Sequence, residues 1–190
     1  MNLLAALGEP RPRLLVCLDL QRANQPPDNC TCARYVRPRL ANCRHILLHA
    51  RAWDWSVVHV HSRWPDDPDG GEPIEGLEPR PSEPVLIRDG LSAFRSRGFC
   101  DLVEGAVQAE LVLIGHSLAG SGLATVFSAH DRRLSSLLVE DAVWARAAGA
   151  IAPAAVEAAA WPLLAPYAGV ITTEVLIGDR EPLKLVREAG

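Results

Sequence analysis

The chain lacks the features that would assign it to a membrane, nucleic-acid-binding or secreted class. No apolar run approaches the roughly 20 residues that a helix needs to cross a bilayer. Positive charge is not in excess, because 19 lysines and arginines against 23 acidic residues give a formal net charge of −4 at pH 7. A secretory signal has a basic segment before its apolar region, and the apolar stretch at 1–7 has none. We therefore expect a cytoplasmic protein with no membrane and no nucleic-acid partner.

Cysteine is also sparse, with 5 residues in 190. An odd number without dense spacing is not typical of a disulfide scaffold, so we expect reduced thiols. Cys30 and Cys32 resemble half of a metal site, but no second Cys or His pair follows at ligand spacing. The sequence therefore predicts no metal and no cofactor.

Strand-like and helix-like segments alternate along the whole length, which is typical of βαβ units around a mostly parallel sheet. Short apolar runs predict strands at 13–18, 56–61, 85–88, 110–114, 136–139 and 169–173. Helical spacing of apolar residues favours helices at 33–53, 99–108 and 120–133, with a helix-prone, alanine-rich segment at 145–160 that Pro153 interrupts. We expect one α/β domain over residues 1–190.

Three polar residues follow apolar strand-like runs, namely Asp19, Arg88 and Ser121. Ligands of open α/β sheets bind beyond the carboxyl ends of the strands, so these three side chains are expected to meet in one crevice. An acid, a fixed cation and a hydroxyl in one pocket indicate hydrolysis. Taken singly, each residue is equally well explained by a turn, an ion pair or a helix cap.

The motifs around these residues resemble those of the isochorismatase-like (cysteine hydrolase) superfamily, which includes nicotinamidases, N-carbamoylsarcosine amidases and isochorismatases. The matching segments are Leu18-Asp19-Leu20-Gln21, Gly76-Leu77-Glu78-Pro79 with Glu83, Arg88 and Ser92-Ala93-Phe94, Gly115 through Gly122 with Thr125, Glu140-Asp141-Ala142-Val143, and Val170-Ile171-Thr172-Thr173-Glu174. They extend over nearly the whole chain. The resemblance implies a three-layer α/β/α fold with a doubly wound, mostly parallel six-stranded sheet, a small-molecule substrate, and assembly as a homo-oligomer.

The resemblance also implies roles for individual residues. The family's catalytic residues are an Asp, a Lys and a nucleophilic Cys, and the matching positions here are Asp19, Arg88 and Ser121. In the family's mechanism the Asp takes the thiol proton, and backbone amides, here those of Ser117 and Ser121, hold the oxyanion. A cis peptide bond would fall at His116–Ser117. Substrate-binding positions are Gln21, Trp64 and Ser117.

The two substitutions affect the chemistry. A serine hydroxyl is much harder to ionise than a thiol, and Arg88 favours the ionised form of Asp19 while it cannot itself give up a proton. Covalent amide hydrolysis is therefore disfavoured, whereas acid-assisted cleavage of a vinyl ether needs no thiol. We interpret the chain as a hydrolase of a small amide, carbamoyl or vinyl-ether compound, or alternatively as a catalytically degenerate binding or assembly protein.

The metal site of the nicotinamidases is absent from the pattern. An Asp and a His that follow the second strand help to hold that metal, and Ser62 and Trp64 stand there in this chain. The resemblance thus implies a metal-free site. We interpret Trp64 as a wall of the substrate pocket, or alternatively as a structural tryptophan. His59 and His61 face the same side of a strand, and without a carboxylate partner we interpret them as core or surface residues.

Two other readings of the sequence are disfavoured. The segment 115–119 resembles the nucleophile elbow of α/β-hydrolases, but His130 is the only later histidine and residues 118–129 contain no acid to precede it, so a triad built on Ser117 cannot be completed. A dinucleotide site is not indicated either, because no Gly-x-Gly-x-x-Gly follows the first strand.

Overall fold

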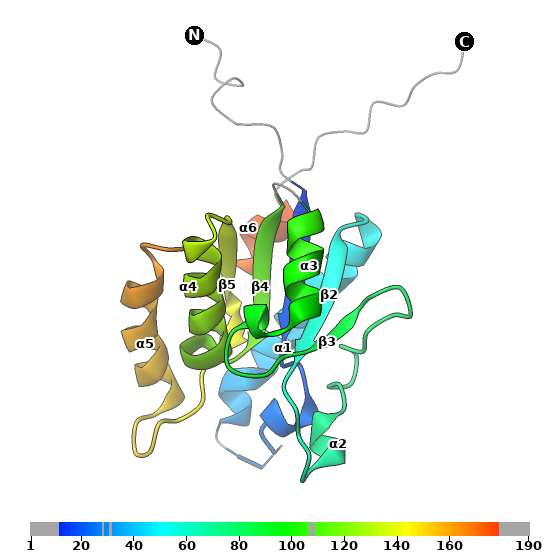
Figure 1. Cartoon of the computed structure of the whole chain (residues 1–190). Coiled ribbons are helices and arrows are strands. Elements are labelled where there is room, and N and C mark those ends of the chain that lie inside the picture. The colour runs from blue at the N-terminus through cyan, green and yellow to red at the C-terminus, as the bar shows by residue number, and fades with distance from the viewer. Residues whose placement is uncertain (1–11, 28, 31, 107–108, 179–190) are drawn as a thin grey trace, which may run out of the picture.

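A six-stranded parallel sheet organises the molecule, with strand order β3-β2-β1-β4-β5-β6 (Figure 1). The computed structural model describes residues 12–27, 29–30, 32–106 and 109–178. The strands are β1 (Arg13–Leu18), β2 (Ser56–His61), β3 (Val85–Ile87), β4 (Glu110–His116), β5 (Ser136–Trp144) and β6 (Gly169–Ile171). Because β1 and β4 are central and the chain extends the sheet from them in both directions, the predicted doubly wound topology is confirmed.

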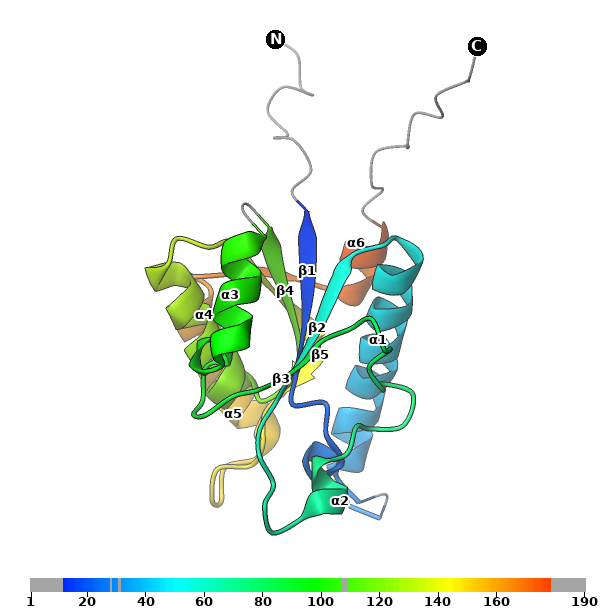
Figure 2. The same ribbon diagram turned by 45° about the vertical axis from the view of Figure 1, so that its right-hand side comes forward.

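Helices cover both faces of the sheet and complete three layers (Figure 2). One face carries α1 (Ala33–Ala52) and α6 (Thr173–Gly178). The other carries α3 (Arg97–Gly105), α4 (Leu123–Asp131) and α5 (Pro153–Leu164), while the short α2 (Pro68–Gly71) lies in the long loop after β2. No helix in the described part of the chain has both the length and the apolar character needed to cross a membrane.

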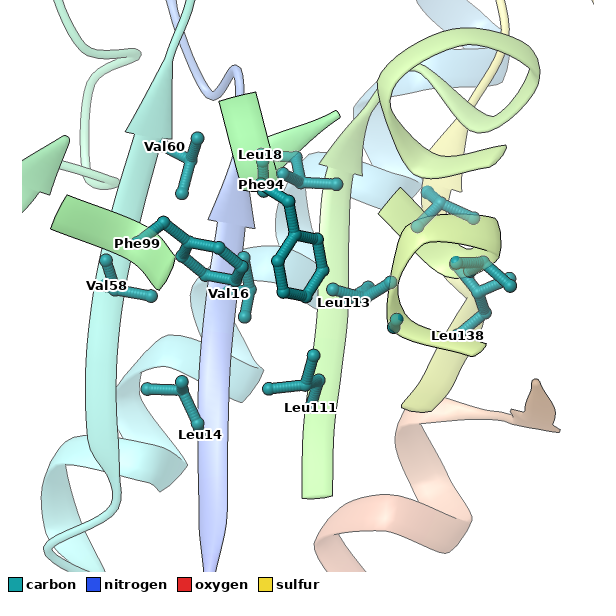
Figure 3. Close-up of a cluster of buried hydrophobic side chains, with 14 of the residues drawn as sticks. Leu14, Val16, Leu18, Val58, Val60, Phe94, Phe99, Leu111, Leu113 and Leu138 are labelled. Carbon is teal, nitrogen blue, oxygen red and sulfur yellow. The ribbon is translucent and has the colours of Figure 1, made fainter. Parts of the chain in front are cut away.

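The core divides into two clusters, one on each side of the sheet. Figure 3 shows the first, in which side chains of β1, β2 and β4 pack against Phe94 and Phe99. The centres of these two rings are 5.0 Å apart, in an edge-to-face arrangement. In the second, α1 buries one stripe at helical spacing, made of Val36, Leu40, Cys43, Leu47 and Ala50. Both faces of β1 are therefore buried, which holds its carboxyl end rigidly where Asp19 follows.

Several predicted boundaries differ from the structure. Strand β5 continues to Trp144, and the alanine-rich segment begins its helix only at Pro153. Proline is favoured at the first helical position, because the N–H that it lacks would have no partner there. Strand β6 ends at Ile171, and Thr173 begins α6, which the sequence did not indicate. Helix α3 starts at Arg97, earlier than predicted, and residues 107–108 of the predicted helix lie outside the described residues.

The cysteine prediction is wrong for one pair. Cys30 and Cys32 form a disulfide before α1, and their Cα atoms are 5.2 Å apart, within the range that a disulfide can bridge. Cys17, Cys43 and Cys100 are free thiols, as expected. The expectation failed because the spacing of cysteines in a chain does not show whether a turn brings them together.

Candidate functional site

Asp19 occupies the first position beyond β1, at the carboxyl edge of the sheet. Its backbone is in the left-handed region, with φ of 46°, where Asp is more often found than most residues. Its neighbours on the sheet follow from the strand register. Leu18 pairs with Val60 on β2 and with Gly115 on β4, so Asp19 lies between His61 and His116. The residue is 2% exposed, so its carboxylate is almost completely withdrawn from water.

The Asp19 carboxylate is engaged at both oxygens. Oδ2 lies 2.5 Å from Nη2 of Arg88, and Oδ1 accepts a hydrogen bond of 2.8 Å from the backbone amide of Ser62. Nη1 of Arg88 donates to the carbonyl of Gly90. The predicted meeting of an acid and a cation is therefore present in the structure, as a buried ion pair with one hydrogen bond between the two side chains.

Ser121 lies in a turn of π-helix, Leu118–Gly122, between β4 and α4, and it is 2% exposed. Its hydroxyl donates to the carbonyl of His116 at 2.8 Å and accepts from the amide of Ser117 at 3.0 Å. The His116–Ser117 peptide bond is cis, at the position that the family resemblance implied. In the part of the chain that the structure describes, Ser121 makes no hydrogen bond to Asp19. The Ser117 amide, to which the resemblance gives the role of holding an oxyanion, therefore donates its hydrogen bond to the Ser121 hydroxyl.

The side chain of Gln21 joins the loop after β1 to the loop after β2. Its Nε2 donates to the carbonyls of Ser62 and Gly71, at 3.1 and 2.9 Å, and its Oε1 accepts from the Ser62 amide at 3.1 Å. The Ser62 amide therefore divides its hydrogen bond between Gln21 and Asp19. In this arrangement Gln21 braces the site, and its contact with a substrate stays a prediction.

Trp64 is half-buried in the same loop. Its indole Nε1 is buried and has no hydrogen-bond partner among the described residues. The guanidinium of Arg146, from the loop after β5, lies 5.9 Å from the centre of its ring. Arg146 did not stand out in the sequence, because its approach to Trp64 depends on how the two loops fold.

Two histidines beside Asp19 are functional candidates that the sequence did not indicate. Nε2 of His61 and Nε2 of His116 are both buried with no partner in the described parts of the chain. Burial, with His59 nearby, lowers the pKa of His61 to about 4. Burial, with Arg146 and Arg88 nearby, lowers the pKa of His116 to about 3. Both imidazoles are neutral at pH 7 and can donate or accept a hydrogen bond. Their signal was positional, since each ends a strand next to β1.

The described residues include no group of three or more His, Cys, Asp or Glu side chains arranged to hold a metal ion. At the positions that the nicotinamidase comparison singled out, Ser62 contributes its backbone amide to Asp19, and Trp64 offers only an indole N–H donor. The metal-free character of the site stays a prediction.

Solved structures share this fold at low sequence identity. An isochorismatase from Pseudomonas putida is 22% identical, with a TM-score of 0.75, over 90% of this chain and 94% of that chain. An isochorismatase family protein from Desulfovibrio vulgaris is 22% identical, with a TM-score of 0.74, over 90% and 98%. The MAR1 ribonuclease from Caenorhabditis elegans is 19% identical, with a TM-score of 0.70, over 89% and 81%.

Identities this low show the fold alone, and no curated protein matches the chain. The family is shown by a model of the isochorismatase domain, which matches residues 13–175. The match begins with β1 and extends to Val175 within α6, so it contains the whole sheet and every residue of the site. The chain belongs to the isochorismatase family.

Proposed function

We propose that this chain binds a small amide, carbamoyl or vinyl-ether compound at the Asp19 site and does not hydrolyse it through Ser121. One observation carries the proposal: the Ser121 hydroxyl donates its proton to the His116 carbonyl rather than to a base. A nucleophilic serine needs a general base within hydrogen-bond reach of that proton. The carboxylate that would serve is already shared between Arg88 and the Ser62 amide.

Binding is supported by buried polar atoms that the described residues leave without partners. These atoms are Nε of Arg88 itself, Nε2 of His61 and Nε2 of His116 at the ends of the strands beside β1, and Nε1 of Trp64 in the loop after β2. Buried polar groups in folded proteins are almost always hydrogen-bonded. A small compound with a carbonyl and an N–H or ether group offers acceptors and donors to such atoms, which favours a polar ligand over an apolar one.

A second candidate function is hydrolysis of the same class of compound in a metal-free site. The observation that favours it is the Ser117 amide, which points at Oγ of Ser121 from 3.0 Å. If the hydroxyl turned away, this amide would be free to stabilise an oxyanion. By the sequence resemblance, Asp19 and Arg88 match the family's acid and its lysine, which also supports this candidate.

A turnover and binding screen separates the two functions. Purified chain would be incubated with nicotinamide, an N-carbamoyl amino acid and a vinyl ether, with product followed by mass spectrometry and binding by calorimetry. We expect binding of at least one compound and no product. Turnover that both Asp19→Ala and Ser121→Ala abolish, with circular dichroism showing folded variants, would overturn the proposal in favour of hydrolysis.

A gain-of-function experiment tests whether Ser121 and Arg88 are the reason for the expected lack of hydrolysis. The double variant Ser121→Cys/Arg88→Lys restores the family's nucleophile and lysine on the same scaffold, and we expect it to acquire amide hydrolysis. The matched control is Ser121→Cys alone, which keeps the Arg88 pair and should gain much less, because the carboxylate stays held by the guanidinium. Equal activity of the wild type and the double variant would contradict the assignment of Ser121 as the inactive position.

A further inference from the structure

A cavity of about 540 Å³ lies beside the Asp19 site, between the start of α1, the loop after β1 and the loop after β5. Its walls include Pro26, Tyr35, Val36, Trp144, Arg146 and Pro153. The volume is within the range of small-molecule sites, which are mostly apolar with a few polar groups that orient the ligand. Asp19, Arg88 and Ser121 are not among its lining residues, so the cavity is separate from the site described above.

The cavity is nonetheless joined to that site through Asn24. The side-chain Nδ2 of Asn24 donates to the carbonyl of Asp19 at 2.8 Å, while its Oδ1 accepts from Nη2 of Arg146. On another wall, the ring centres of Trp144 and His116 are 5.7 Å apart. Through Asn24, a ligand in the cavity would therefore be separated from Asp19 by a single side chain.

Among the described residues that line the cavity, Arg146 is the only charged one. Its Nη2 also donates to the carbonyl of Ala23 at 3.1 Å, which fixes the guanidinium against the loop after β1. In the part of the chain that the structure describes, it forms no ion pair with a carboxylate and makes no other hydrogen bond. An arginine held in this way keeps N–H groups for a ligand, and the guanidinium fork matches a carboxylate.

The other walls favour a flat apolar ligand. Tyr35 is half-buried and supplies aromatic surface, and the half-buried Pro26 and Pro153 are conformationally rigid. Trp144 is only 1% exposed, so it forms the base of the cavity and offers a ligand little surface. The described walls therefore accept an aromatic ring and offer no charge besides Arg146.

We propose that this cavity binds a small aromatic carboxylate, with the carboxylate paired to Arg146 and the ring packed against Tyr35 and Pro153. Arg146 neutralises the carboxylate of the ligand, and the aromatic ring displaces water from the apolar walls of the cavity. The proposal does not depend on whether the Asp19 site turns over its own ligand.

Benzoate is the probe for this site, with benzyl alcohol as an uncharged analogue of similar shape. Calorimetric titration of the full chain would be compared with Arg146→Gln and Arg146→Lys. The matched control is Arg97→Gln, an exposed arginine on α3, on the opposite face of the sheet from α1. We expect millimolar or tighter binding of benzoate, at least about tenfold weaker in Arg146→Gln, intermediate in Arg146→Lys and unchanged in Arg97→Gln, as for loss of one charge-assisted contact.

Benzyl alcohol should bind weakly and equally to the wild type and Arg146→Gln. In NMR spectra of the wild type, benzoate should shift the ring signals of Tyr35, assigned by a Tyr35→Phe variant. No benzoate binding at millimolar concentration, equal binding by wild type and Arg146→Gln, or unshifted Tyr35 signals would each overturn the proposal. Because this proposal is read from Arg146→Gln and the Tyr35 signals, whereas the Asp19 site is tested with Asp19→Ala and Ser121→Ala, either proposal can fail without the other.

Discussion

Nη2 of Arg88 lies 2.5 Å from Oδ2 of Asp19, and the two residues are 9% and 2% exposed. The arginine follows β3 and the acid follows β1, with β2 between these strands in the sheet. Their contact therefore extends across the carboxyl ends of three neighbouring strands. The same contact occupies Oδ2 of Asp19, and among the described residues Asp19 makes no hydrogen bond to Ser121.

The ion pair should contribute strongly to folding. Replacing Arg88 by Ala leaves the Asp19 carboxylate buried without its cation, and we expect the free energy of unfolding to fall by about 3–5 kcal/mol. Urea denaturation followed by circular dichroism measures this change. The exposed Arg97→Ala is the control and should change stability by less than about 0.5 kcal/mol.

The matched double variant Asp19→Asn/Arg88→Met removes both charges and should recover much of the loss, because no buried charge is left unpaired. A loss of less than about 1 kcal/mol for Arg88→Ala would contradict a buried, dry pair.

Gly115 should be essential for the approach of β1 and β4 next to the site. Its φ is +109°, and a Cβ added there would lie 2.1 Å from the carbonyl oxygen of Leu18. Gly115→Ala should therefore lower the free energy of unfolding by more than about 2 kcal/mol, because the backbone of the strand pair would have to move.

The control for this substitution is Gly105→Ala at the end of α3, where a Cβ would meet nothing within 4 Å. That change should be neutral or stabilise the chain by up to about 1 kcal/mol, since alanine favours helix more than glycine does. Thermal unfolding of the two variants side by side gives the comparison, and equal melting temperatures would contradict the strain assigned to Gly115.

Stability should fall as the pH is lowered from 6.5. Burial lowers the pKa of His61 to about 4 and of His116 to about 3, against an ordinary value of 6.5, so between these values the unfolded chain takes up protons that the folded chain refuses. Their stabilising effect is complete above pH 6.5 and declines through this window. Each histidine contributes a slope on the order of 1 kcal/mol per pH unit.

Urea denaturation between pH 6.5 and 4.5 tests this. In that window Glu157, whose pKa burial raises to about 7 from 4.5, contributes one opposing slope, which the two histidines outweigh. Glu83, whose pKa is lowered to about 2 from 4.5, adds its own loss only below the window. The variant His116→Gln keeps a polar side chain that does not titrate, and it should show a shallower dependence of unfolding free energy on pH. The slope is compared within each protein, so a general loss of stability does not affect the result. A slope identical to that of the wild type would exclude His116 as a contributor.

Much of the fold was predictable from local pattern. The bounds of β1 and β2 agree with the prediction, because short apolar runs bounded by polar residues and turns are a strong signal. The start of α5 at Pro153 and the extension of β5 to Trp144 were missed, since the choice between strand, loop and helix there depends on packing against neighbouring elements. The Cys30–Cys32 disulfide was missed for a similar reason, because it depends on the turn that brings the two residues together.

The sequence by itself determined the family, the α/β topology and the positions of Asp19, Arg88 and Ser121, because these depend on residue order and on strand-ending positions that parallel strands bring to one edge. Only the tertiary structure decided what those residues do to each other. The Ser121 hydroxyl bonds to the backbone of His116 and Ser117, and Asp19 bonds to Arg88 and Ser62. Such hydrogen bonds depend on distances and angles between segments far apart in the chain, so a linear pattern cannot specify them.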